Sequence, residues 1–301
     1  MIVAGMIAAL SMCLMLYKLL PLPCVIIIAV LAFGVGLIRS RHHHGGFLSI
    51  DLYAQRSPLR HVNPGLKTAY ALAAIVISVA GRSYLICILV CVVSFVYTVA
   101  LGKVPARQYC RMLMLPVGFI SLSSIALTLQ LSSVQSGYVD IPLGNVFLSV
   151  TRASQLQAIG ISLSAYAGVS SLYMLGLTTP LPGIIKTLND MHLPGIIIEL
   201  MYLIYRYIFV LFSIQDTMST AASSRLGYRG YRRSVKTIML IASNLLSLSF
   251  MQASRNFDAM EARCYDGTLR FYEQVSGLKP RHVLGFGSIT AVLVVLWILG
   301  V

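Results

Sequence analysis

The sequence predicts an all-α protein: a polytopic membrane helical bundle with a cytoplasmic helical domain. Hydrophobic residues make up 57% of the 301-residue chain and charged residues only 11%, and the mean hydropathy is +0.83, which excludes an ordinary soluble domain of this length. The apolar residues gather in runs that approach or exceed the length of a membrane-spanning helix. The acidic residues are unevenly distributed. Residues 1–179 hold eleven Lys/Arg and two Asp/Glu, whereas residues 180–301 hold twelve Lys/Arg and seven Asp/Glu.

The net charge of +14 is explained by lysines and arginines retained on the cytoplasmic side of a membrane. No basic run interleaved with aromatic residues, which would be typical of nucleic-acid binding, stands out in the sequence. We therefore expect the lipid bilayer as a partner of this chain and no nucleic acid.

Residues 1–45 predict a hydrophobic helical hairpin. Its arms are the apolar runs Met1–Leu16 and Cys24–Ile38, and positive charge follows the first run instead of preceding it as in a signal peptide. The triplet His42-His43-His44 comes next. Three imidazoles are able to hold a transition metal, but three consecutive residues do not converge as a preorganised site does. A metal role and a polar loop beside the membrane both stay open.

Residues 46–179 predict the transmembrane helices. The segment Asp51–Lys67 carries three Lys/Arg against one aspartate, which is typical of a cytoplasmic linker lying along the membrane surface. The 102–111 loop has three Lys/Arg and the 135–145 loop has none, so we expect the first inside and the second outside. The expected spans are approximately 68–80, 84–101, 112–134 and 146–177.

Residues 180–280 predict cytoplasmic helices, and residues 281–301 a last transmembrane helix. The segment Ile196–Ile214 is apolar enough to span a membrane, yet it contains Glu199 and Arg206 on one helix face, with Tyr202 between them. We expect this intramembrane pair to interact directly or through a tyrosine hydroxyl, with either a functional or a structural role.

A long helix is predicted from Ser234 to Arg263. Its apolar and small residues recur every three or four positions, so another helix is able to approach this face closely. The stripe consists of Val235, Ile238, Ala242, Leu246, Ser249, Ala253, Phe257, Met260 and Cys264.

Two helices are predicted to end in the same way. The first ending is Ser224-Arg225-Leu226-Gly227-Tyr228-Arg229-Gly230, and the second is Ala262-Arg263-Cys264-Tyr265-Asp266-Gly267. The glycines Gly227, Gly230 and Gly267 are predicted to end the helices, because glycine readily takes a left-handed conformation. An arginine in a last helical turn either caps its own helix or binds a carboxylate of another protein. Finding both arginines in like surroundings favours contact with a partner.

The residue patterns argue against an enzyme. The spans contain no HExxH, no GxSxG and no carboxylate cluster, and a glycine-rich phosphate loop is missing. The six cysteines show neither metal-ligand nor disulfide spacing. We therefore expect no catalytic residue, no metal ligand and no bound cofactor in this chain, and any ATP must be used by a partner.

The sequence resembles a known family in five stretches. They are RSPLRHVNPGLK at 56–67, GLTTPLPGIIKTL at 176–188, ELMYLIYRYIFVL at 199–211, SSRLGYRGYRRS at 223–234 and AMEARCYDG at 259–267. In these it is similar to the transmembrane T component of energy-coupling-factor (ECF) transporters of the cobalt/nickel (CbiQ) type. The resemblance runs from about residue 47 to the end, and the last two stretches, in that order, are the most specific.

The resemblance implies a division of labour. In this family the T component neither binds the substrate nor hydrolyses ATP, and its cytoplasmic coupling helices dock into grooves on two ABC-type ATPase subunits. The same scaffold holds a substrate-binding membrane subunit, the CbiM-like S component. We further expect residues 1–45 to pack against the bundle or a small accessory membrane subunit. The expected location is the cell membrane, with the coupling-helix domain in the cytoplasm.

The family's Ala-Arg-Gly-like signatures fall on Ser224-Arg225-Leu226 and Ala262-Arg263-Cys264. Both depart from the pattern, because Cys264 replaces the usual glycine and the first copy matches only at its arginine. The expected substrate is cobalt or nickel, and a vitamin-type ECF module is the alternative. A stand-alone channel or secondary transporter is less favoured, because the four central spans carry almost no acidic residues.

Overall fold

The computed structural model describes residues 46–81, 83–132, 140–143, 146–265, 267 and 280–298, together with residues 7, 8, 10, 11 and 15. Its internal contacts divide the chain into two compact units. Unit 1 comprises residues 1–180 and 275–301, and unit 2 comprises residues 181–274. The domain boundaries predicted from the sequence stay a prediction.

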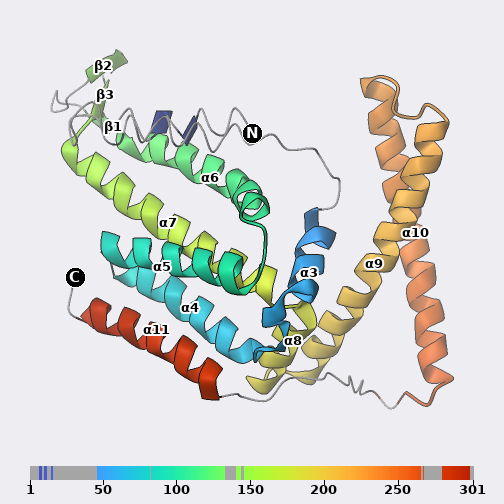
Figure 1. The fold of residues 1–301 in the computed structure, drawn as a ribbon. Helices are drawn as coiled ribbons and strands as arrows, with labels where there is room; N and C mark the ends of the chain where they lie inside the picture. The colour runs from blue at the N-terminus through green and yellow to red at the C-terminus, as the bar shows by residue number, and fades with distance from the viewer. Residues whose placement is uncertain are drawn as a thin grey trace. The chain divides into compact units, whose positions relative to one another are not determined.

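Unit 1 is a helical bundle built around one long helix, α7 (Figure 1). Helices α3, α4, α5 and α6 all pack against α7, and α11 packs against α4 and α5. The bounds are α3 Gly46–Arg56, η1 Pro58–His61, α4 Pro64–Ala80, α5 Tyr84–Val96, η2 Tyr97–Leu101, α6 Ala106–Thr128, α7 Arg152–Thr178 and α11 Pro280–Ile298.

Helix α7 serves as the centre because most of its buried positions are small. Ala158, Ala167 and Ser171 are fully covered, and small side chains let neighbouring helices approach closely in a membrane. Its hydroxyl groups join the helices: Ser171 donates to the carbonyl of Ala71 at 3.3 Å, and Ser170 is hydrogen-bonded to Tyr109 at 3.0 Å. These hydroxyl groups of α7 thus form hydrogen bonds between helices, which offset the cost of burying them in an apolar surrounding.

The structure confirms the predicted fold class. Among the described residues, five helices are long and apolar enough to cross a membrane. They are Tyr84–Leu101, α6, α7, α9 (Gly195–Ser224) and α10 (Tyr231–Glu261). The shorter α4 and α11 are also apolar and cover the predicted spans 68–80 and, approximately, the C-terminal one.

A small antiparallel sheet corrects two of the predicted spans. The run 112–134 is helical only to Thr128, and the run 146–177 becomes helical only at Arg152. The strands are β1 Leu129–Ser132, β2 Asp140–Leu143 and β3 Val146–Val150, in the order β1-β3-β2. A short apolar run fits either a strand or a buried helix. The spans predicted from hydropathy were therefore too long. Thr151 and Ser154 form a capping box that begins α7 after β3.

Few residues of the predicted N-terminal hairpin are described. Residues 7, 8, 10, 11 and 15 are helical, and Ala8, Ser11 and Met15 are buried. The hydroxyl of Ser124 on α6 lies 2.9 Å from the sulfur of Met15. The rest of the hairpin and His42-His43-His44 lie outside the described residues.

Unit 2 consists of α8 Leu181–Asp190, α9 and α10. Helix α8 packs against α9, and α9 against α10, which run in opposite directions as a long hairpin (Figure 1). Helix α9 has 30 residues, which at 1.5 Å per residue is about 45 Å. The hairpin is sparsely covered, since none of the α10 residues is buried.

The stripe predicted on α10 is mostly open. Ile238, Leu246 and Phe257 on that stripe are 56%, 60% and 53% exposed. The partly covered face instead includes Gln252 and Asn256, whose side chains are hydrogen-bonded to each other at 3.5 Å. Apolar residues occur on more than one face of α10, so periodicity alone did not tell which face lies against α9.

Candidate docking site at two helix ends

The first predicted ending, after α9, is a Schellman motif. The N–H of Gly227 donates to the carbonyl of Ala222 at 2.8 Å, and the N–H of Leu226 donates to Ser223 at 3.0 Å. Leu226 itself has φ of +57°, which is the left-handed conformation of the residue after the C-cap. The C-cap is Arg225, so the arginine side chain is attached at the residue where the helix ends.

The second ending, after α10, repeats this geometry. The N–H of Tyr265 donates to Met260 at 3.1 Å, and the N–H of Cys264 donates to Glu261 at 2.9 Å. Cys264 has φ of +58°. In hydrogen-bond pattern, Arg263 therefore corresponds to Arg225 and Cys264 to Leu226. The two copies seen in the sequence are two copies of one backbone turn.

The residues that end the helices are not the predicted glycines, and this is a correction. The left-handed positions of the two turns belong to Leu226 and Cys264, where a side chain has to tolerate a conformation that glycine takes freely. Gly230 and Gly267 do have positive φ, +90° and +89°, but they lie beyond the turns. Gly230 is the residue before α10.

Gly227 is needed for space rather than for its conformation. A Cβ on this residue would lie 2.9 Å from the carbonyl oxygen of Ala222 and 3.0 Å from the hydroxyl oxygen of Thr237. Thr237 belongs to α10, and its hydroxyl donates to the Gly227 carbonyl at 2.9 Å. The absence of a side chain at 227 thus lets the turn lie directly on the next helix.

Further hydrogen bonds fix the first turn. The hydroxyl of Ser234 donates to the Tyr228 carbonyl at 3.0 Å, and the Tyr228 hydroxyl is hydrogen-bonded to Ser219 at 3.0 Å. Arg225 is exposed, and its neighbour Leu226 is 58% exposed. The first end therefore presents a guanidinium and an apolar side chain on a fixed backbone.

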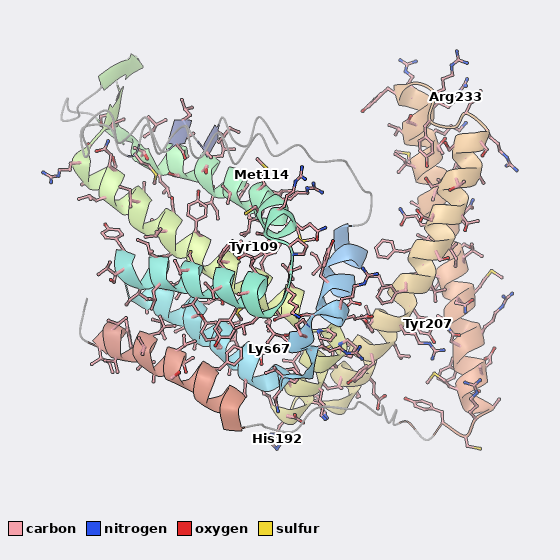
Figure 2. All side chains as sticks on the ribbon, viewed as in Figure 1. Lys67, Tyr109, Met114, His192, Tyr207 and Arg233 are labelled. Carbon is pink, nitrogen blue, oxygen red and sulfur yellow. The ribbon has the colours of Figure 1, made fainter. Side chains whose placement is uncertain are left out.

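The two ends differ in electrostatics. The first carries further exposed cations, namely Arg229, Arg232, Arg233 and Lys236, with no Asp or Glu between residues 217 and 257. Figure 2 shows Arg233 at the end of the hairpin where α9 passes into α10. At the second end, exposed Arg263 has the acidic residues Asp258 and Glu261 nearby in sequence. The first end is thus a strongly basic surface and the second is mixed.

The second end is attached to the start of α9. The hydroxyl of Tyr265 donates to a carboxylate oxygen of Glu199 at 3.2 Å, across 66 positions of sequence. A tyrosine hydroxyl thus reaches Glu199 from the turn that follows α10. The guanidinium carbon of Arg206 lies 5.9 Å from the centroid of the Tyr207 ring. The pairing of Glu199 with Arg206 stays a prediction.

The sequence did not point to Tyr265, Ser234 or Thr237 as residues that hold these ends. Their contacts join different elements, and a tyrosine or threonine at such a position has no distinctive local pattern. Within the described residues, no group of three or more His, Cys, Asp or Glu is placed to hold a metal ion. The arrangement suits docking of another protein: two fixed turns, each with an exposed arginine, at opposite ends of one hairpin.

Comparison with known proteins decides the family. Residues 55–273, well over half of the chain, match the CbiQ family, described as cobalt transport protein. The chain belongs to the CbiQ family. It is therefore a T component of the ECF type, a non-catalytic membrane protein of a transport system. The matched residues include both helix ends.

Three relatives show what the chain is similar to. The chain is 25% identical to a cobalt transport protein CbiQ of Rhodobacter capsulatus over 222 residues, 74% of this chain and 86% of the relative. It is 29% identical to a fused cobalt transport protein CbiMQ of Methanocorpusculum labreanum over 262 residues, 84% of this chain but only 44% of the relative. An uncharacterized protein of Methanocaldococcus jannaschii is 27% identical over 250 residues, 82% of this chain and 91% of the relative.

Proposed function

We propose that this chain is the energy-coupling subunit of an ECF-type ABC importer, and that it transmits the ATP-driven motion of two ATPase subunits to a substrate-binding membrane subunit. The observation that carries the proposal is the repeated turn with its exposed arginine, Arg225 at one end of the α9–α10 hairpin and Arg263 at the other. The coupling residues are Ser224, Arg225, Leu226, Ala262, Arg263 and Cys264.

The dimensions of the hairpin fit two separate ATPase subunits. Antiparallel helices of 30 and 31 residues separate their C-terminal ends by about 45 Å, because each residue adds 1.5 Å. Each arginine then docks on its own ATPase, where a guanidinium is able to make two parallel bonds to one carboxylate. A displacement of either ATPase is carried along a continuous helix.

The open apolar stripe of α10 supports docking of a further, membrane-bound partner subunit. An exposed row of large apolar side chains needs lipid or another apolar surface to cover it. One relative is a fused cobalt transport protein CbiMQ, which favours a CbiM-like S component as that partner. A small accessory membrane subunit beside residues 1–45 belongs to the same proposal.

The substrate that we propose is the cobalt ion, with nickel next and a vitamin-type ECF module as the alternative. The relatives described as cobalt transport proteins are 22–29% identical, which supports the transport system more than the ion. In this scheme the chain binds no cofactor, ATP is used by the partner ATPases, and the complex lies in the cell membrane with unit 2 in the cytoplasm.

The test is co-purification of the Arg225→Glu/Arg263→Glu double variant with the candidate ATPases, combined with ion uptake in cells. Both side chains are exposed, so the variant is expected to insert and fold while losing ATPase binding and uptake. Lys103, exposed in unit 1, supplies the control Lys103→Glu, which is expected to retain ATPase binding. Persistent ATPase binding and uptake in the double variant would contradict the proposal and leave the arginines as helix caps.

A further inference from the structure

Lys67 is a fully buried cation in unit 1. It lies in the first turns of α4, is labelled in Figure 2, and is 1% exposed. Its ammonium donates to two backbone carbonyls, that of Leu59 at 3.0 Å and that of Thr178 at 2.9 Å. Lysine is almost never fully buried without partners, so these two bonds are what makes the position tenable.

Both acceptors have a local reason to receive a cation. Thr178 is the last residue of α7, and the last carbonyls of a helix lack helical partners and carry partial negative charge. The Leu59 carbonyl lies in η1 and also accepts the N–H of Val62 at 3.0 Å. Asn63 caps the start of α4 through a 2.8 Å bond to the Gly65 N–H. The segment 57–67 is therefore a folded clasp that presents Lys67 to the end of α7.

The end of α7 is where the chain leaves unit 1. Unit 2 begins at residue 181, three positions after Thr178. The last turn of α7 is closed by a backbone hydrogen bond, in which the N–H of Thr179 donates to the carbonyl of Leu175 at 2.9 Å. Two of the stretches that resemble the family, 56–67 and 176–188, thus meet in one contact whose sequence separation is 111 residues. Neither stretch belongs to the two arginine ends.

We propose that Lys67 is a positioning residue for energy coupling, which pins the last turn of α7 to the clasp 57–67. This rests on the proposed function. A pull from unit 2 along the chain either frays the last turn of α7 or moves the helix as a whole. Loss of the Thr178 contact makes fraying easier, because the final carbonyl then has no partner in an apolar surrounding. With Lys67 in place, the pull reaches the bundle through its central helix.

The test compares Lys67→Met, which keeps the length of the side chain, with wild type in the complete complex reconstituted in liposomes. ATP hydrolysis and ion uptake are measured together, and amide hydrogen exchange of Thr179 is followed by mass spectrometry. The Lys67→Met complex is expected to assemble and hydrolyse ATP while taking up several-fold fewer ions per ATP. Exchange at Thr179 is expected to be roughly tenfold faster, about 1.4 kcal/mol.

Thr179→Val is the matched control. Its hydroxyl is buried, with no hydrogen-bond partner among the described residues, so this change perturbs the same junction without removing a bond. It is expected to leave both the ratio of ions to ATP and the exchange rate unchanged. A Lys67→Met complex with the wild-type ratio of ions to ATP would overturn the proposal.

A second measurement needs no variant. In the wild-type complex, the Thr179 amide is expected to exchange equally slowly without nucleotide and during ATP turnover, because a pinned helix moves as one body. Loss of its protection during turnover would overturn the proposal even if Lys67→Met does not fold. Failure of the proposed function would be seen separately, as wild-type protein that does not bind the ATPases.

Discussion

Gly227 offers the sharpest local test of how the first docking end is built. The substitution is Gly227→Ala, which places a Cβ 2.9 Å from the Ala222 carbonyl oxygen and 3.0 and 3.2 Å from the Oγ1 and Cγ2 atoms of Thr237. The Ala222 oxygen also accepts the Gly227 N–H. The new methyl group therefore pushes apart the hydrogen bond of the turn and the contact with α10 together.

The magnitude follows from these contacts. Overpacking a close contact typically costs about 1–3 kcal/mol, and a lost hydrogen bond about 1 kcal/mol. Replacing glycine recovers about 0.4–1 kcal/mol, since the unfolded chain loses freedom. The expected net loss of stability of the turn is about 1–3.6 kcal/mol, which is roughly a fivefold to several-hundredfold increase in its opening.

The assay is amide hydrogen exchange of residues 219–240 in detergent, within a double-mutant cycle with Thr237→Ala. Removing the Thr237 side chain relieves two of the three close contacts, so the two substitutions together are expected to cost clearly less than their sum. Gly230→Ala is the control: its Cβ meets no atom within 4 Å and its strain comes from φ of +90°. Strict additivity of Gly227→Ala and Thr237→Ala would refute the steric reasoning.

Two predictions concern the second docking end. Tyr265→Phe removes the hydroxyl that donates to Glu199. Equilibrium binding is expected to show a loss of about 1 kcal/mol, or roughly fivefold, in affinity for the ATPase. Unchanged affinity would argue against a positioning role for this bond. Cys264→Gly is expected to keep ATPase binding and leave the melting temperature equal or slightly higher, because glycine relieves the left-handed strain at φ of +58°. Cys264→Val is expected to lower the melting temperature, since a branched side chain fits this conformation worst; a valine variant as stable as the glycine variant would contradict the assigned geometry.

The spans were predictable because hydropathy is a property of whole segments. The helices α5 and α7 and the two long helices of unit 2 lie near their expected positions. The three strands were missed: β1 and β3, of four and five residues, are too short to reveal a change from helix to strand at the end of a span, and β2 lies in the predicted 135–145 loop. The apolar stripe of α10 was predictable but its covering was not, because periodicity shows that a face is apolar without telling what lies against it.

The two helix ends were predictable in place but not in backbone detail. The paired arginines stand out in the sequence, whereas left-handed Leu226 does not, because leucine is disfavoured in that conformation and glycines lie close by. The contacts of Lys67 with Thr178 and of Tyr265 with Glu199 join residues 111 and 66 positions apart. Such contacts depend on the folded backbone and have no local signature.

The most direct test of the central claim is photo-cross-linking from the two helix ends within the assembled complex. A photoreactive amino acid is placed at Leu226 or at Cys264, and the control position is Met239, which is 66% exposed within α10. If each end docks on an ATPase, cross-links to ATPase form from Leu226 and from Cys264, and Met239 yields none. Cross-linking from neither end, in complexes that still hydrolyse ATP and take up ions, would contradict the account.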